Sequence, residues 1–277
     1  MSRITFAQIA GMNMHYVFYP FECFLDAVAR CGISRVEVWG GAPHAQVEEL
    51  TPRRVTRLRR EIELRGLEVV CFTPEQCVYP VNLAAAERGL RRRSVRYFAQ
   101  AVRAAAELGA GMVLITSGRG YFNGPIVEAW ERSHESLAEV AEVAGEYGVT
   151  LALEALQTTE SNLVTDLDSL GAMLGELCSP HARACLDTVA MAAAGDTIAA
   201  YFDRLGGDLV HVHLTEGDPT GHLAWGDGKL PLGDYLHELG ERGYRGSLTL
   251  EIGDERYVRD PEAATRRAVE TLRAFLD

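Results

Sequence analysis

The chain has 277 residues, 47% hydrophobic and 24% charged, so it can bury a sizeable core and is too apolar to be disordered. It contains 27 Lys and Arg residues and 39 Asp and Glu residues, which gives a formal net charge of -12. This charge repels phosphate groups, and no apolar stretch approaches the roughly 20 residues that span a bilayer, so we expect neither a nucleic-acid nor a membrane partner. The 6 cysteines lack CxxC spacing and no secretory signal precedes them, which predicts reduced thiols and a cytoplasmic protein.

Short β-rich runs alternate along the chain with longer amphipathic or alanine-rich stretches. Strands are predicted over 3–8, 35–39, 67–72, 112–116, 149–154, 182–187, 209–214 and 247–252. Helices are predicted over 21–31, 52–65, 87–108, 125–147, 166–177, 197–205, 232–242 and 261–275. Several of these helices end next to a glycine, such as Gly109 or Gly148, and glycine accepts the left-handed conformation found at helix C-termini.

The repeated strand and helix units define the expected fold. Eight units in 277 residues average about 35 residues each, and the strands are short and apolar, as buried parallel strands require. We therefore predict an α/β protein, a single (β/α)8 TIM barrel domain over 1–277. A doubly wound open sheet is the alternative, but it usually has a glycine-rich phosphate loop after its first strand, and QIAGMN at 8–13 is not such a loop.

Four neighbouring predicted strands end in acidic residues or histidine, on the rim where barrel enzymes do their chemistry. Glu154 ends the fifth strand and Asp187 the sixth. His213 lies near the end of the seventh and Glu251 near the end of the eighth. Three carboxylates and one imidazole suit a divalent ion of intermediate hardness, Mn²⁺ first, with Mg²⁺, Co²⁺ or Zn²⁺ as rivals. The alternative is that the glutamates pair with arginines and His213 is a hydrogen-bonded core residue.

Two further titratable residues lie within predicted strands. His211 and His213 alternate along one strand and so point to the same side, with His213 nearer the rim. We therefore assign the metal ligand to His213 and expect His211 to be buried one layer deeper. Glu37 lies inside an apolar run and is interpreted as a buried charge paired with an arginine.

Several segments resemble one family, the sugar isomerase and epimerase barrels that include the tagatose and psicose 3-epimerases, and most closely its fructoselysine branch. The resemblance covers nearly the whole chain, and its fairly specific motifs are WGGxPH and GDGK. It implies a metal-dependent ketose 3-epimerase that acts on a small sugar or sugar-amine and assembles as a homo-oligomer, a dimer or tetramer. The matching segments are VEVWGGAPH at 36–44, TPE at 73–75, Glu154 through ESN at 160–162, and GDGKLP at 226–231.

The resemblance also assigns roles to residues. The metal quartet of the family falls on the four residues at the strand ends, and its two glutamates, here Glu154 and Glu251, act as acid and base on opposite faces of the sugar. The substrate-contacting glutamate of the family falls on Glu160. The quartet is Glu154, Asp187, His213 and Glu251.

Three more loop residues are predicted substrate contacts from their positions after strands. His44 follows the second strand, Glu75 the third and His222 the seventh. The alternatives are a loop-capping role for His44, a turn cap for Glu75 and a solvent-exposed loop around His222.

This sequence departs from the simple ketohexose 3-epimerases at two sugar-contacting positions. Their histidine three residues after the metal aspartate is Ala190 here, and their arginine six residues after the metal histidine is Pro219. The fructoselysine branch shares the divergence and keeps a histidine matching His222. The departures argue against an unmodified hexose or pentulose and favour a fructoselysine-like ketose-amine.

The expected reaction removes a proton beside a ketone from one face and delivers a proton to the other, through a cis-enediolate. An aldose-ketose isomerase and a C-glycoside-cleaving lyase are alternatives that keep the metal. An abasic-site endonuclease of the same fold is disfavoured by the net charge of -12 and by Ala190, where it would have a histidine. A non-catalytic sugar-binding protein would not need two opposed glutamates on a metal.

Overall fold

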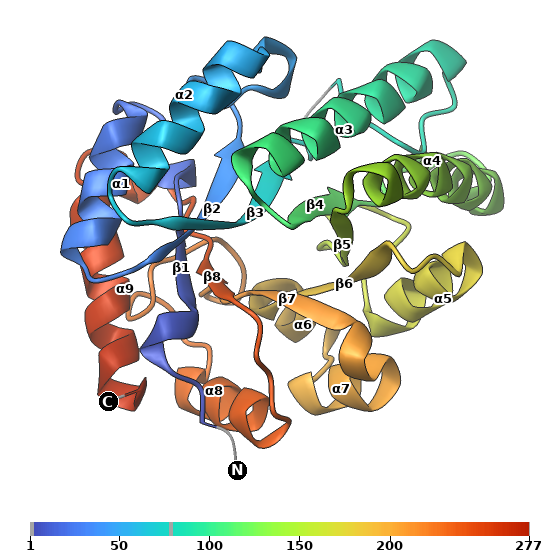
Figure 1. Cartoon of the computed structure of the whole chain (residues 1–277). Coiled ribbons are helices and arrows are strands. Elements are labelled where there is room, and N and C mark those ends of the chain that lie inside the picture. Colours follow the sequence, from blue (N-terminus) through green and yellow to red (C-terminus); the bar gives the residue numbers. More distant parts are fainter. Residues whose placement is uncertain (1–2, 78–79, 277) are drawn as a thin grey trace.

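Eight parallel strands close into a barrel in the computed structural model, which describes residues 3–77 and 80–276. Each strand pairs with its neighbours along the chain, and β1 pairs with β8 to close the sheet (Figure 1). This confirms the predicted (β/α)8 barrel. The strands are β1 (Ile9–Met12), β2 (Arg35–Gly40), β3 (Glu68–Pro74), β4 (Met112–Thr116), β5 (Thr150–Glu154), β6 (Ala182–Asp187), β7 (Leu209–His213) and β8 (Leu248–Leu250).

Helices surround the barrel and cover the outer face of the sheet (Figure 1). Gly109 and Gly148 follow α3 and α4 with φ of 85° and 65°, the left-handed conformation expected at these positions. The helices are α1 (Phe21–Arg30), α2 (Pro52–Glu63), α3 (Arg88–Leu108), α4 (Ile126–Tyr147), α5 (Leu167–Leu177), α6 (Thr188–Ala194), α7 (Ile198–Leu205), α8 (Leu232–Glu241) and α9 (Pro261–Leu276).

The first strand lies later in the chain than predicted. Within the predicted strand 3–8, Phe6–Gln8 forms a 3-10 helix, because the Gln8 side chain accepts a hydrogen bond from the Thr5 N–H at 3.1 Å and caps the turn. The strand itself contains Gly11, where a Cβ atom would overlap a valine of α1. Glycine lets α1 approach the sheet closely here, and it also weakens the strand signal in the sequence.

A short helix, α6, follows β6 directly and was not predicted. The Asp187 side chain accepts a hydrogen bond from the Ala190 N–H at 2.6 Å and so caps the N-terminus of α6. This capping bond uses Oδ1 and fixes the orientation of the carboxylate at the barrel rim.

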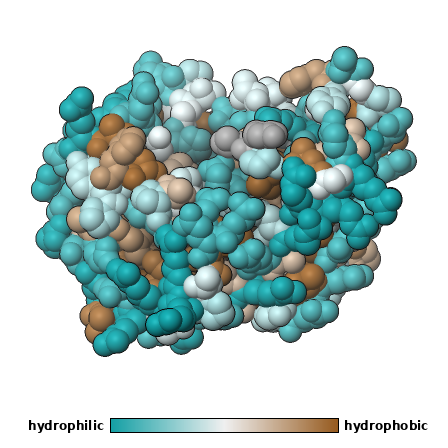
Figure 2. Space-filling model, turned by 90° about the horizontal axis from the view of Figure 1, so that it is seen from above, coloured by the Kyte–Doolittle hydropathy of each residue, from teal (hydrophilic) through white to brown (hydrophobic). Residues whose placement is uncertain are grey.

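Apolar side chains fill the space between the sheet and the helices, whereas the barrel interior combines a few apolar side chains with buried polar residues such as Glu37 and His211. The interior cluster is small and contains Cys71, Leu114, Ala152 and Cys185. The side of the molecule in Figure 2 is mostly hydrophilic, with apolar residues in separate patches, as expected where amphipathic helices face water. None of the described helices is long and apolar enough to cross a membrane.

Candidate metal centre

Strand register brings four titratable side chains to one point of the barrel rim. Asp187 is the register partner of His213, and His213 is also the partner of Thr249. Glu251 follows Thr249 by two residues, so it projects to the same side. Glu154, Asp187, His213 and Glu251 are all buried, and each offers a ligand atom within 4.8 Å of the others.

Two atoms of this cluster have no hydrogen-bond partner and could bind a cation. Nδ1 of His213 lies 2.8 Å from Oε1 of Glu154 and 3.1 Å from Oε2 of Glu251. Neither contact has hydrogen-bond geometry, so this buried nitrogen has no hydrogen-bond partner, and neither has Oδ2 of Asp187. Buried polar atoms are nearly always satisfied, and a divalent cation between them would bind these atoms. The residues therefore fit a metal ion.

The opposite edge of the His213 ring is held by a carboxylate. Nε2 of His213 lies 3.0 Å from Oε1 of Glu37, and Nε2 of His211 lies 2.7 Å from Oε2 of the same residue. The prediction that Glu37 pairs with an arginine was wrong: its partners are two histidines that lie 174 and 176 residues away in the chain. His211 is buried below His213, as expected.

Burial and the surrounding charges shift the pKa values of the three carboxyl groups in different directions. Burial raises the pKa of Glu154 to about 7, against the pull of the neighbouring His213. Burial also raises the pKa of Asp187, and the charge of Glu251 adds to this. Burial acts in the same direction on Glu251, but the imidazoles of His213 and His222 outweigh it and hold its pKa below the ordinary value.

A cavity of about 220 Å³ opens beside the metal cluster. Glu154, Asp187 and Glu251 reach its wall, and Ala190 lines it as well. Among the described residues that line the cavity, acidic side chains outnumber basic ones. Its carboxylates are Glu75, Glu154, Glu160, Asp187 and Glu251, and the basic side chain is His222.

Three of the four predicted substrate contacts line this cavity. Nε2 of His222 lies 3.6 Å from Oε2 of Glu251. Oε2 of Glu75 accepts a hydrogen bond from the Trp39 indole at 3.2 Å. Oε2 of Glu160 accepts one from the backbone N–H at position 157, also at 3.2 Å, and burial raises the pKa of this carboxyl.

The fourth predicted contact, His44, lies elsewhere. Its Nδ1 is 3.0 Å from the Asn13 amide nitrogen, and its Nε2 is 2.8 Å from the Tyr19 carbonyl oxygen. His44 lines a surface groove beside α1 and α2. It is not among the described residues that line the central cavity. Both ring nitrogens serve loop contacts, which matches the loop-capping alternative.

The loop between β7 and α8 carries His222 and contains the GDGK motif. The buried carboxylate of Glu216 accepts hydrogen bonds from the backbone N–H groups of Gly217 and Leu230, both at 2.9 Å, and so ties the two ends of the loop together. Asp227 binds Arg267 of α9 at 2.5 Å and accepts a hydrogen bond from the Tyr257 hydroxyl at 2.7 Å. The motif thus anchors the loop, a role that its spacing alone did not reveal.

Sequence reasoning did not single out several residues of the cavity wall. They are Trp39, which the sequence analysis included only as part of a motif, and Gln76 and Cys77. Gln76 accepts a hydrogen bond from the Thr116 N–H at 2.8 Å, which fixes the start of the loop after β3. The signal in the sequence was position, because each of these residues lies near the C-terminal end of a barrel strand.

Fold and site together define a TIM barrel with a candidate metal centre at the C-terminal ends of its strands. The chain belongs to the xylose isomerase-like TIM barrel family, whose sequence profile matches residues 25–275. Fructoselysine 3-epimerase of Shigella flexneri is 31% identical over 260 residues, which cover 93% of this chain and 94% of that protein. L-ribulose 3-epimerase of Mesorhizobium japonicum is 28% identical over 173 residues, 61% of this chain and 57% of the relative.

Solved structures share the fold. D-psicose 3-epimerase from Clostridium cellulolyticum H10, crystallised with D-tagatose, superposes with a TM-score of 0.81 at 18% identity, covering 98% of this chain and 99% of that chain. A 3-keto-D-glucoside 4-epimerase from E. coli gives a TM-score of 0.80 at 18% identity, covering 96% and 99%.

Proposed function

We propose that this protein is a metal-dependent ketose 3-epimerase. The observation that carries the proposal is the convergence of two glutamates, Glu154 at the end of β5 and Glu251 directly after β8, on one His213 nitrogen at the proposed cation position, where both also reach the cavity. The extended similarity to fructoselysine 3-epimerase, over 93% of this chain, supports the same reaction class.

The proposed metal ligands are Oε1 of Glu154, Oδ2 of Asp187, Nδ1 of His213 and Oε2 of Glu251. This donor set of three hard oxygens and one imidazole favours Mn²⁺, with Mg²⁺, Co²⁺ and Zn²⁺ as rivals. When bound, such an ion supplies positive charge that acidifies the carbon beside the ketone and stabilises the enediolate.

The two glutamates carry the protons. One carboxylate removes the proton on C3 from one face of the ketose. The electron pair of the broken C–H bond forms the C2–C3 double bond, and the π pair of the C2 carbonyl moves onto its oxygen, which gives a cis-enediolate. The other glutamate, as a carboxylic acid, then delivers its proton to C3 from the opposite face, while the oxygen pair forms the C2 carbonyl again. Each glutamate ends in the protonation state the other had at the start, so the roles reverse with direction.

Cavity charge supports a substrate with an amino group. A divalent ion offsets charge in the quartet, which leaves Glu75 and Glu160 as further carboxylates in a cavity where only His222 is basic among the described lining residues. Such a wall attracts an ammonium group and repels a phosphate. We therefore propose a ketose-amine of the fructoselysine type over a sugar phosphate, with plain ketoses as weaker substrates.

The proposal is tested by incubating the Mn²⁺-loaded protein with fructoselysine and with plain ketoses, and separating the products by chromatography. A C3 epimer of at least one ketose, lost on chelation and restored by Mn²⁺, is the expected result. An aldose product identifies the isomerase alternative instead, and cleavage of a C-glycoside identifies the lyase. Either result overturns the proposal.

A further inference from the structure

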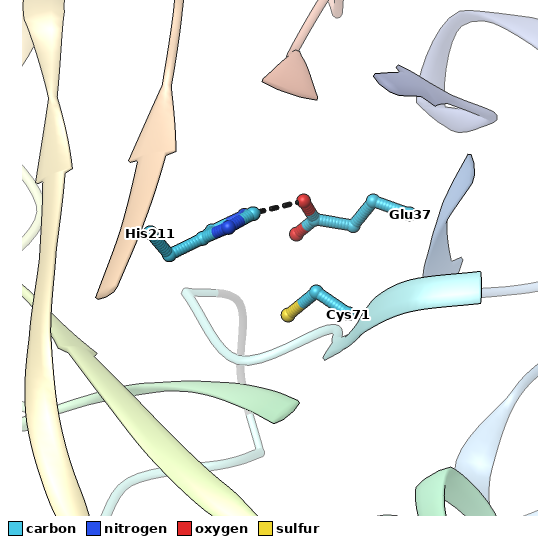
Figure 3. A group of neighbouring side chains, drawn as sticks. All are labelled: Glu37, Cys71 and His211. Carbon is cyan, nitrogen blue, oxygen red and sulfur yellow. Dashed lines mark hydrogen bonds and ion pairs between the residues drawn. The ribbon is translucent and has the colours of Figure 1, made fainter. Parts of the chain in front are cut away.

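Glu37 lies wholly inside the barrel, with 0% of its surface exposed, and none of the steps above uses it. Its side chain leaves β2 and crosses the interior toward β7, where it meets His211 (Figure 3). Its two carboxylate oxygens contact different imidazoles, Oε2 that of His211 at 2.7 Å and Oε1 that of His213 at 3.0 Å. One buried carboxylate therefore bridges the metal-site histidine and a second histidine beneath it.

The chemistry of the carboxylate determines which ring nitrogens carry hydrogen. An ionised carboxylate only accepts hydrogen bonds, so His211 and His213 must both donate from Nε2. Oε2 faces the His211 imidazole, and Oε1 faces both the His213 imidazole and the Thr73 hydroxyl, so hydrogen-bond donors surround both oxygens and favour the ionised form. For His213, an Nε2–H donated to Glu37 leaves Nδ1 as the nitrogen that faces Glu154 and Glu251.

We propose that Glu37 is a positioning residue for the metal centre: it fixes the ring of His213 with Nδ1 directed at the cation position, and His211 in turn holds Glu37. Carboxylates that accept the second N–H of a ligating histidine set its tautomer and orientation. This inference rests on the proposed metal site, and it gives the buried residues Glu37 and His211 a role in that site.

The environment of Glu37 supports this role. The Thr73 hydroxyl donates a hydrogen bond to Oε1, so three donors surround the carboxylate, which offsets the cost of burying its charge. Cys71 lies beside Glu37 and His211 (Figure 3), but its thiol lies 3.8 Å from the Thr73 hydroxyl and, among the described residues, makes no hydrogen bond to Glu37 or His211. Cys71 thus shares the burial of the group without sharing its role.

The first test compares Glu37→Gln with Cys71→Ala by calorimetric titration of the metal-free proteins with Mn²⁺. In Glu37→Gln the side-chain amide places an NH₂ group against one imidazole, which must then give up its Nε2–H. We expect Mn²⁺ affinity to fall roughly 10- to 100-fold. Cys71→Ala removes a buried side chain from the same layer, and we expect its affinity to stay within about threefold of the wild type.

A second pair of variants keeps the test decisive if Glu37→Gln does not fold. His211→Gln retains an N–H donor for Glu37, whereas His211→Leu removes it. We expect His211→Gln to bind Mn²⁺ nearly as the wild type does, and His211→Leu to bind it more weakly. Imidazole ¹⁵N spectra of the Zn²⁺-loaded protein should show hydrogen on Nε2 of His213 in the wild type, and this signature should be lost or shifted in His211→Leu.

Equal Mn²⁺ affinity in the wild type, Glu37→Gln and His211→Leu overturns this inference alone. A second bound ion that disappears in Cys71→Ala also overturns it, because Glu37, Cys71 and His211, whose ligand atoms lie within 4.8 Å of one another, would then be ligands themselves. If the wild type binds no divalent ion, the proposed function fails and the inference fails with it.

Discussion

Glu154 and Glu251 come from strands that are not neighbours, yet their carboxylate oxygens lie 2.8 and 3.1 Å from the same nitrogen of His213. This arrangement ties the metal position to both proposed proton-transfer groups. A substrate oxygen near the cation would bring the adjacent carbon between the two carboxyl groups. The proposed metal ligands and the proposed acid–base groups are thus the same two carboxylates.

Replacing Glu251 with Gln should remove one proton-transfer group while keeping the size of the side chain. We expect kcat to fall roughly 100- to 10,000-fold, the range for loss of a general acid or base. Glu75→Gln is the matched control, because Glu75 lines the same cavity but lies outside the metal quartet. Full turnover of Glu251→Gln with metal bound, measured by epimer formation and metal analysis, would show that the assignment is wrong.

Metal binding should stabilise the fold. The carboxylates of the quartet are buried close together, so a bound cation relieves their repulsion in the folded state only. At a free Mn²⁺ concentration 100 times its Kd, the free energy of unfolding should rise by about 2.7 kcal/mol. Calorimetric melting with and without chelator measures this. Asp187→Asn should lose most of the rise in Tm, and an unchanged rise in that variant would count against Asp187 as a ligand.

Glu160 should distinguish charged from neutral substrates. Its carboxyl lies in the cavity wall outside the quartet, and a charged hydrogen bond to an ammonium group contributes about 1.5 kcal/mol. Glu160→Gln should therefore raise KM for a ketose-amine roughly tenfold and leave KM for a neutral ketose nearly unchanged. Parallel kinetics on both substrates provide the measurement, and equal changes in both would exclude an ammonium-specific role.

The loop that carries His222 should depend on Gly228. A Cβ atom at this position would overlap the carboxylate of Glu216, which holds the ends of the loop. Gly228→Ala should lower the free energy of unfolding by about 1 to 3 kcal/mol and raise KM. Gly207→Ala is the control, because a Cβ atom there meets nothing within 4 Å. If the two variants show the same stability in urea and the same KM, the loop does not depend on this contact.

Stability at mildly acidic pH should depend on His15. Burial lowers its pKa from 6.5 to about 3 in the folded protein, so below pH 6.5 the unfolded chain binds a proton that the folded chain does not. The stability that neutral His15 contributes to the free energy of unfolding is fully present above pH 6.5. It is lost at about 1.4 kcal/mol per pH unit as the pH falls toward 3.

His15→Gln keeps a side-chain amide near Thr265, the partner of Nε2 at 3.0 Å, but cannot titrate. Between pH 6.5 and 5, urea unfolding of the metal-free proteins should show the wild type losing about 2 kcal/mol more than the variant. Identical pH dependence in both proteins would mean that His15 is accessible to protons in the folded state.

Much of the fold was predictable because its signals are local. Short apolar strands recur along the chain, and glycine follows most of the helices; both signals depend only on neighbouring residues. The first strand was predicted too early in the chain because residues 3–8 have the composition of a strand. The actual strand, Ile9–Met12, contains Gly11, which the close packing of α1 requires but which is unusual in a strand. Helix α6 is too short to show a clear period.

The clustering of the four rim residues was predictable for a related reason: parallel strands place their C-terminal ends at one rim, so position along the strand already groups the side chains. The partners of Glu37 were not predictable, because His211 and His213 meet it only across the closed barrel. His44 follows a strand as a site residue would, but the path of its loop directs both ring nitrogens to Asn13 and Tyr19.

The most direct test of the proposed function is proton NMR of the Mn²⁺-loaded protein, incubated in D₂O with fructoselysine or a plain ketose and freed of the metal before the spectrum is recorded. The two-glutamate mechanism predicts that deuterium appears at C3 and that the C3 epimer forms with it. Deuterium at C1 or C2 with an aldose product, or no exchange at any carbon of any ketose tested, would contradict a 3-epimerase.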